Sequence, residues 1–251
     1  MGGMVYTFWY WKKRMKVIDP AVFGVNHPST WEVDEKHIGR SKNKLVIVKN
    51  FFTNPDDLRM YAQSVDYLST IQGEVTNLPG YLHLISNFKK GLYSPLRYIC
   101  ANYFGCSDET MRHPEESRFS FQIYDVDEKV RFMSLYPHSD YTRYAAVLSL
   151  NNDDEYEGEV PNGTAFWRVK ETGEEYVCGE RNYRSERIAN KVNSMVSFDP
   201  AKVKLKEWER YHVEEHSNNA LLLYEGSLWH SPYFQKDNWK TKRLTFNAFI
   251  R

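Results

Sequence analysis

The chain has 251 residues, in which 33 Lys and Arg balance 33 Asp and Glu, so its formal net charge is zero. A balanced chain has no general attraction to nucleic acid or to an anionic membrane, and neither is expected as a partner. An aromatic content of 16% favours a fold rich in strands. Cys100, Cys106 and Cys178 form no CxxC pair, which argues against a thiolate zinc site and fits a reducing cytoplasm.

The first part of the chain, residues 1–45, is expected to be an irregular, aromatic-rich extension. Its apolar stretch Tyr6–Trp11 is followed by basic residues instead of being preceded by them, unlike a signal peptide. The stretch is also far shorter than the roughly 20 residues that a membrane span needs. The run Leu45–Phe52 then predicts a short buried strand.

Residues 46–117 are expected to hold this strand and bracing helices. Asn54 followed by Pro55 is typical of a helix start, and the helix is predicted to run to about Tyr67. Ser94-Pro95 repeats the pattern and predicts a second helix that ends near Gly105.

From residue 118 onward, apolar runs alternate with breaks rich in Asp, Asn, Gly and Pro. Strands are expected at 118–124, 130–136, 145–151, 164–169, 194–198, 220–226 and 243–250. Strands after a helical first half predict a mainly β (α+β) fold, a jelly-roll barrel braced by helices. We expect one domain over 1–251, with the jelly-roll core at 118–251 and a polar excursion at 170–193.

A metal site is predicted by His138 and Asp140, which stand two residues apart. On a strand, residues i and i+2 point to the same face, so the imidazole and the carboxylate can converge on one ion. With one distant His, they make the two-His, one-carboxylate set typical of non-haem iron(II) oxygenases. Such a set leaves coordination positions open for a cosubstrate and oxygen.

The His-x-acid pattern is weak on its own, because it occurs three times in this chain. The three triplets are His113-Pro-Glu115, His138-Ser-Asp140 and His212-Val-Glu214. A surface His beside a solvated acid explains any one of them. Only the second triplet lies among predicted barrel strands and is followed by further groups at suitable distances.

Those further groups are His230, after a strand and a Gly-containing turn, and the triplet Arg243-Leu-Thr245, which opens the last predicted strand. In isolation, each has an ordinary structural explanation. In this order, they suggest a ligand pocket. A guanidinium there can bind a small carboxylate through two hydrogen bonds, while the Thr245 hydroxyl donates to the same group.

A His-x-Asp pair, then a distant His, then Arg-x-Thr resembles the 2-oxoglutarate/iron(II) oxygenase superfamily. The resemblance covers the barrel half of the chain and implies a double-stranded β-helix. It implies that iron(II) is bound by His138, Asp140 and His230. It further implies that Arg243, helped by Thr245, binds the distal carboxylate of 2-oxoglutarate, and that O₂ is a cosubstrate.

More locally, the chain is similar to an uncharacterised bacterial branch of that superfamily. The similar segments are VIVKNFFTNPDDLRMYA, YPHSD, NGTAFWR and LLLYEGSLWHS. Prolyl-hydroxylase-like members place a Tyr before the His-x-Asp to contact 2-oxoglutarate, at a spacing that this chain does not match. Tyr124 and Tyr136 are both candidates, and strict strand alternation favours Tyr136, which would share the face of His138.

The resemblance therefore implies a cytoplasmic dioxygenase that hydroxylates a C–H bond of a small-molecule or peptidyl substrate, with release of succinate and CO₂. Asp140 argues against halogenation, because halogenating relatives carry a small residue there. Candidate substrate contacts are Trp167, Arg168, the 170–193 excursion and Phe8–Trp11.

Two other classes stay open. A cupin-like metal isomerase or dioxygenase that uses no 2-oxoglutarate would leave Arg243 without a role. A non-catalytic jelly-roll binding module would keep the barrel without its chemistry. The sequence does not indicate an oligomeric state.

Overall fold

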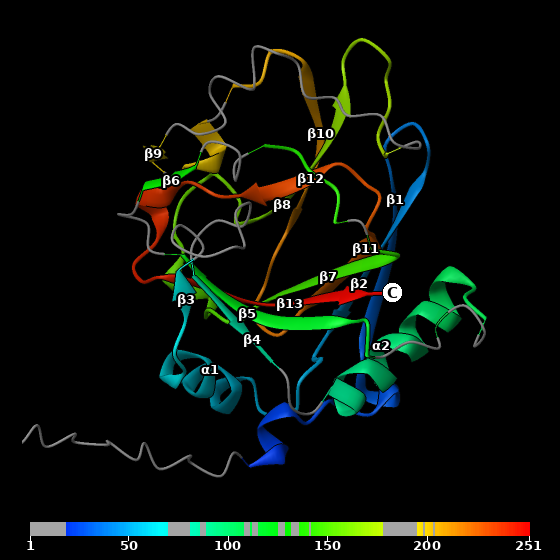
Figure 1. Ribbon diagram of the computed structural model, residues 1–251, viewed down its shortest axis with the longest axis vertical. Coiled ribbons are helices and arrows are strands. Elements are labelled where there is room, and N and C mark those ends of the chain that lie inside the picture. The colour runs from blue at the N-terminus through cyan, green and yellow to red at the C-terminus, as the bar shows by residue number, and fades with distance from the viewer. Residues whose placement is uncertain are drawn as a thin grey trace, which may run out of the picture.

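The computed structural model describes residues 19–69, 81–85, 89–107, 111, 115–124, 129–131, 136–140, 142–177, 195–197, 199–202 and 204–251. Two antiparallel sheets face each other, and the helices lie against the outer face of the larger one (Figure 1). Within these ranges, no helix is both long and apolar enough to cross a membrane.

Strands dominate the described chain. The helices are α1 (Pro55–Ser64) and α2 (Lys89–Phe104). The strands are β1 (Glu32–Ile38), β2 (Asn43–Lys49), β3 (Leu68–Ser69), β4 (Tyr81–Leu84), β5 (Arg118–Tyr124), β6 (Lys129–Arg131), β7 (Tyr144–Ser149), β8 (Gly163–Val169), β9 (Met195–Ser197), β10 (Trp208–Glu215), β11 (Leu221–Glu225), β12 (His230–Tyr233) and β13 (Arg243–Ile250).

The strand order is that of a double-stranded β-helix, which confirms the predicted jelly-roll barrel. The larger sheet has the order β1-β2-β11-β7-β13-β5-β4-β3, and the smaller sheet has the order β10-β8-β12. An isolated antiparallel bridge from His138 to His230 extends the smaller sheet beyond β12. From β5 to β13 the chain therefore passes back and forth between the two sheets, as a jelly roll requires.

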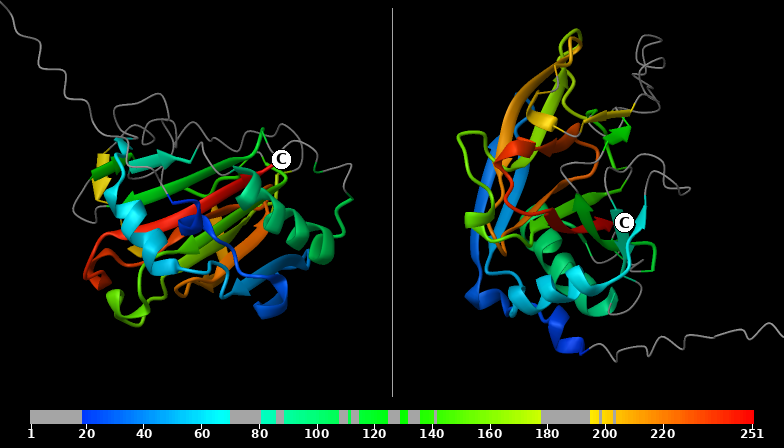
Figure 2. Two further views of the ribbon diagram at one scale, coloured as in Figure 1. Left: turned by 90° about the horizontal axis from the view of Figure 1, so that it is seen from below. Right: turned by 90° about the vertical axis from the view of Figure 1, so that its left-hand side faces the viewer.

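Side-chain alternation on β2 separates two layers of core. Val46 and Val48 pack toward the helices, whereas Leu45 and Ile47 pack between the sheets with Phe166. Figure 2 shows α1 and α2 lying apart from each other on the outer face of the larger sheet. A strand that is buried on both faces has a continuous run of apolar residues, and for this reason β2 was predictable from the sequence.

The first helix begins at Pro55 as expected but ends at Ser64, short of the predicted end near Tyr67. Val65 has extended backbone, with φ −86° and ψ 157°, and stops the helix. The Tyr67 side chain folds back, and its hydroxyl donates to the carbonyl of Ala62 at 2.7 Å.

The second helix begins at Lys89, so the predicted start at Ser94-Pro95 is wrong. Pro95 lies inside the helix, where it removes one backbone hydrogen bond. The stripe Leu92, Leu96 and Ile99 explains why the helix continues through it, because these three buried side chains lie at helical spacing in one core. The helix ends before Gly105, whose φ of +66° suits a glycine terminator.

The strands β1, β3, β4, β10 and β12 were not predicted. Of the two longest, β1 falls in the extension expected to be irregular, and β10 falls in a charged run. Each is an edge strand, β1 of the larger sheet and β10 of the smaller. Edge strands carry exposed polar residues, so they lack the apolar pattern by which the central strands are recognised.

The expected strands at 118–124 and 243–250 coincide with β5 and β13. Four expectations fall wholly or largely outside the described residues, namely the contact segment Phe8–Trp11, the strand at 130–136, most of the 170–193 excursion and Cys178. Cys100 and Cys106 are buried free thiols.

The turn between β1 and β2 is held by a fully buried carboxylate, Glu175. It accepts hydrogen bonds from the backbone N–H groups of Arg40 and Ser41 at 2.8 and 3.1 Å, and from the Asn43 amide at 2.9 Å. Its Oε1 also lies 3.4 Å from the Arg168 guanidinium. One side chain thus joins the base of the polar excursion to the larger sheet.

We expect Glu175→Ala to lower the free energy of unfolding by about 3 kcal/mol, because several buried donors would lose a charged acceptor at once. Urea denaturation measures the change. Glu171→Ala, at an exposed position of the same segment, serves as the control and should shift stability by less than about 0.5 kcal/mol. Equal effects of the two substitutions would contradict the role assigned to Glu175.

Candidate metal centre

The structure brings His138, Asp140 and His230 together, and their ligand atoms all lie within 4.8 Å of one another. Nε2 of His230 is 3.1 Å from one Asp140 carboxylate oxygen, and Nε2 of His138 is 3.9 Å from the other. The two imidazole rings are 4.5 Å apart between centroids. Two imidazole nitrogens and a carboxylate therefore face a common point.

Backbone carbonyls fix which nitrogen of each ring faces that point. Nδ1 of His138 lies 3.1 Å from the carbonyl oxygen of Tyr136, and Nδ1 of His230 lies 2.9 Å from that of Leu228. A carbonyl can only accept, so each Nδ1 carries the proton and each Nε2 can present its lone pair to a metal.

Main-chain pairing holds the ligand segments together. His138 and His230 exchange two backbone hydrogen bonds of 2.9 Å each. The N–H of Asp140 donates to the carbonyl of Gly226 at 2.9 Å. A Cβ at Gly226 would lie 2.4 Å from the Thr142 carbonyl oxygen, so only glycine allows this close approach.

The acid–base properties of the three groups are coupled. Burial alone would raise the pKa of Asp140, but the adjacent His230 lowers it. Burial alone would lower the pKa of His230, but the Asp140 carboxylate reverses this and leaves that pKa raised. Partial burial and the charge of His230 lower the pKa of His138. The set thus favours one carboxylate and at least one neutral imidazole.

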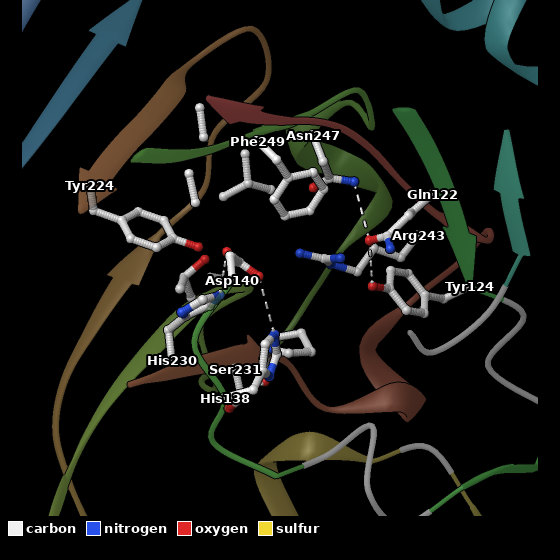
Figure 3. A pocket seen from close by; sticks show the side chains of 15 residues that line it. Gln122, Tyr124, His138, Asp140, Tyr224, His230, Ser231, Arg243, Asn247 and Phe249 are labelled. Carbon is white, nitrogen blue, oxygen red and sulfur yellow. Dashed lines mark hydrogen bonds and ion pairs between the residues drawn. The ribbon is translucent and has the colours of Figure 1, made fainter. Parts of the chain in front are cut away.

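The three groups open into a pocket between the two sheets (Figure 3). Its empty volume is about 540 Å³, a figure that includes space open to solvent. The other lining residues are Gln122, Tyr124, Ala145, Ala146, Val147, Thr164, Tyr224, Ser231, Pro232, Arg243, Asn247 and Phe249.

Arg243 reaches this pocket from the first residue of β13 and is only 3% exposed. Its guanidinium carbon lies 5.2 Å from the ring centroids of both Tyr124 and Phe234, and its Nε donates to Oδ1 of Asn162 at 3.1 Å. In the described part of the chain, no acidic side chain forms an ion pair with it. Burial lowers the pKa of this guanidinium, so an anion at the site would be strongly favoured.

The sequence-predicted residues separate into two groups. His138, Asp140, His230 and Arg243 line one pocket, whereas Thr245 is not among the residues that line it. Thr245 is on the same face of β13 as Arg243, but its hydroxyl accepts a hydrogen bond from the Asn247 amide at 3.1 Å.

Tyr136 also lies away from the pocket lining, and its ring packs edge-on against Trp208 at 5.9 Å. Strict alternation does not apply here, because among the described residues 136–140 only His138 makes a strand-like bridge. Tyr124, the other candidate, lines the pocket beneath Arg243, and its hydroxyl donates to Gln122 at 3.0 Å.

Sequence reasoning missed several pocket residues, among them Thr164, Gln122 and Tyr224. Each of these three lies on a predicted strand, but nothing in the sequence indicated that its face of the strand turned toward a ligand site. Side-chain alternation, counted from His230 and Arg243 onto the paired strands, would have identified such residues only if the register of the strands had been known.

The rival triplets do not form comparable sites. His212 and Glu214 contact each other at 3.1 Å, but Glu214 also pairs with Lys36 at 2.8 Å. The three side chains form an ion-pair network and not a set of metal ligands. His113 lies outside the described residues. Trp167 packs in the smaller sheet, with its indole N–H donating to Ser231 at 2.9 Å, as ordinary barrel packing would have it.

Fold and site together define a double-stranded β-helix protein with a candidate two-His, one-carboxylate metal centre. The chain belongs to DUF6445, a family of unknown function, whose model matches residues 29–250. A search of the curated proteins finds no match.

Among solved structures, the chain is similar to a Pseudomonas putida prolyl-4-hydroxylase, at 10% identity and a TM-score of 0.43, over 88% of this chain and 92% of that one. It is also similar to HygX from Streptomyces hygroscopicus with iron bound, at 12% identity and a TM-score of 0.37, over 85% and 83% of the two chains. A third similarity is to the Escherichia coli ribosomal oxygenase YcfD, at 13% identity and a TM-score of 0.33, over 82% of this chain and 48% of that one.

A buried histidine stands behind the Arg243 side of the pocket. Nε2 of His216 lies 2.9 Å from the Thr164 hydroxyl, and the ring is 8% exposed. Burial, with a smaller contribution from the charge of Arg243, lowers the pKa of His216 to about 3. The ring is therefore neutral when the protein is folded, whereas in the unfolded chain it is protonated below its ordinary pKa of 6.5.

This difference predicts a loss of stability in mild acid. Because the unfolded chain binds the proton more tightly, His216 should reduce the free energy of unfolding by about 2 kcal/mol between pH 7 and pH 5. His216→Gln keeps a donor toward Thr164 but cannot titrate. Urea denaturation at the two pH values should show a smaller drop in the variant, and an equal drop in both proteins would refute the assignment.

Proposed function

We propose that this protein is a non-haem iron(II), 2-oxoglutarate-dependent oxygenase that hydroxylates a C–H bond of a small-molecule or peptidyl substrate. One observation carries the proposal: a His-Asp-His set and a buried guanidinium without an acidic partner face the same pocket. The first can hold a metal and the second an anion, so the pocket suits a ligand that is both a metal chelator and a carboxylate.

The donor set fits iron(II). Imidazole nitrogen and carboxylate oxygen suit this ion, and three protein ligands leave positions for other molecules. A metal-dependent hydrolase with the same ligands would need a further general base. Beyond the triad, the described residues that line the pocket include no acid and no histidine, which favours the oxygenase over the hydrolase.

Cupin-like chemistry without 2-oxoglutarate is less well supported for two reasons. Such sites generally use more histidines, and within the described residues no fourth His, Cys, Asp or Glu joins the group. A cupin-like reaction would also leave the buried charge of Arg243 uncompensated. A non-catalytic binding module would not need three ligand side chains pinned by the backbone.

His138, Asp140 and His230 would hold iron(II), which couples the oxidation of 2-oxoglutarate to succinate and CO₂ with insertion of one oxygen atom of O₂ into a substrate C–H bond. Arg243 would bind the distal carboxylate of 2-oxoglutarate and so orient the cosubstrate. The rings of Tyr124 and Phe234 hold that guanidinium in place, and Asn162 occupies its Nε.

The hydroxyl groups near this carboxylate site differ from those expected from the sequence. We propose Tyr124 in place of Tyr136, because Tyr124 lines the pocket directly beneath Arg243. We likewise propose Thr164 in place of Thr245. Thr164 lines the pocket, and His216 holds its hydroxyl from behind.

Anaerobic addition of iron(II) and 2-oxoglutarate to metal-free protein should produce a weak visible charge-transfer band, since both ligands would bind at one centre. His138→Ala should abolish the band because it removes a ligand. His212→Ala removes the histidine of a rival triplet and should leave the band intact. No band with the unsubstituted protein, or equal loss in both variants, would refute the proposal.

Replacement of Arg243 by Met should separate cosubstrate binding from metal binding. The variant loses the buried positive charge, so the dissociation constant for 2-oxoglutarate should rise roughly 100-fold. The iron(II) affinity should stay within about threefold, because Arg243 is not a ligand. Isothermal titration calorimetry measures both, and Arg210→Met, at an exposed arginine of β10, provides the control. Equal weakening of both affinities would contradict the carboxylate role.

A further inference from the structure

Tyr224 has a rigidly held ring beside the candidate metal centre. It comes from β11 and is only 4% exposed. Its ring packs edge-on against Phe166 at 5.2 Å and against His230 at 4.9 Å. Figure 3 shows its hydroxyl pointing toward Asp140, on the side of the triad away from Arg243.

The Tyr224 hydroxyl makes no hydrogen bond with any residue that the structure describes, although it lines the pocket. Its surroundings are otherwise apolar, with Ala145 opposite it on β7 and Phe166 beneath it. A phenylalanine would satisfy the packing, so packing alone does not explain the hydroxyl.

Asp140 is the group that needs such a donor once a metal is bound. In the described chain, its carboxylate oxygens contact only His138 and His230. With a metal between them, both Nε2 lone pairs point at the ion, and both Nδ1 protons are already given to backbone carbonyls. Neither ring can then donate to Asp140, whose side chain is 8% exposed.

We propose that Tyr224 is a positioning residue that donates a hydrogen bond to the Asp140 oxygen not bound to the metal. This inference rests on the proposed function, because it assumes that the triad binds a metal. The hydrogen bond would hold Asp140 to binding through one oxygen and so keep a coordination position available. Ligating carboxylates in metal sites are generally held by such partners.

Two features suit Tyr224 to this role. A tyrosine hydroxyl is protonated at neutral pH, so it can donate a hydrogen bond. Arg243 is the other strong donor of the pocket, but it forms no ion pair with Asp140 and is engaged by Asn162 and the two flanking aromatic rings.

The test compares Tyr224→Phe with Tyr144→Phe. Tyr144 is also a buried strand tyrosine, but its hydroxyl already has a partner, the Cys106 thiol at 2.8 Å. Titration with Co²⁺, followed by its visible absorption, measures metal affinity and coordination without catalysis. Thermal unfolding of the metal-free proteins measures the cost of each hydroxyl.

We expect Tyr224→Phe to weaken Co²⁺ binding at least about tenfold and to change the visible spectrum. In the metal-free protein the same variant should unfold at an equal or higher temperature, because a hydroxyl without a partner is removed. Tyr144→Phe should leave the Co²⁺ affinity and spectrum unchanged and should lower the unfolding temperature.

Co²⁺ binding by Tyr224→Phe within twofold of the unsubstituted protein, with an unchanged spectrum, would overturn the inference while leaving the proposed function standing. A lower unfolding temperature of metal-free Tyr224→Phe would also overturn it, since the hydroxyl would then have a structural role. If the unsubstituted protein binds no Co²⁺, the proposed function itself fails, and the inference with it.

Discussion

The pair of backbone hydrogen bonds between His138 and His230 is the constraint on which the site depends. It joins an irregular segment to the edge of the smaller sheet, so two residues far apart in the sequence present their imidazoles at one place. Asp140 is fixed by the same means, through its N–H to Gly226. The spacing of the ligand atoms is therefore set by main-chain geometry, and the side chains need only adopt the rotamers that local carbonyls stabilise.

This dependence on the backbone explains what was predictable from the sequence. In a jelly roll, the order of the strands along the chain determines which strands become neighbours. The order of the His-x-Asp pair, His230 and Arg243 along the sequence therefore predicted that these residues meet in one pocket, as they do. The central strands β5 and β13 were also predictable, because both are bordered by strands and read as apolar runs.

What the sequence did not reveal depends on departures from regular geometry. Tyr136 was assigned to the pocket by strict alternation, but the described residues 136 and 137 lie outside any strand, and the Tyr136 ring packs against Trp208. Thr245 obeys alternation, yet Asn247 takes its hydroxyl. Pro95 suggested a helix start, whereas the apolar stripe on both sides of it determines the helix. In each case, tertiary packing outweighed a local rule.

Electrostatically, the pocket has two unlike ends. An acid and two imidazoles occupy one, and a guanidinium surrounded by aromatic rings and an amide occupies the other. His216 behind the second end is kept neutral, so it adds no positive charge there. The aromatic rings and the amide carry no negative charge, so the proposed function assigns the rest of the cost of a buried charged arginine to a bound anion.

Gly226 carries a consequence for tracing the family's history. Because a side chain there would collide with the Thr142 carbonyl, the turn before His230 and the turn after Asp140 can interlock only through a bare backbone. A relative that retained all three ligands but acquired a larger residue at this place would have to separate the two turns. Divergence of the candidate metal centre would thus be recorded at a residue outside the His-Asp-His set, and a search for relatives that share this site should require that glycine together with the triad.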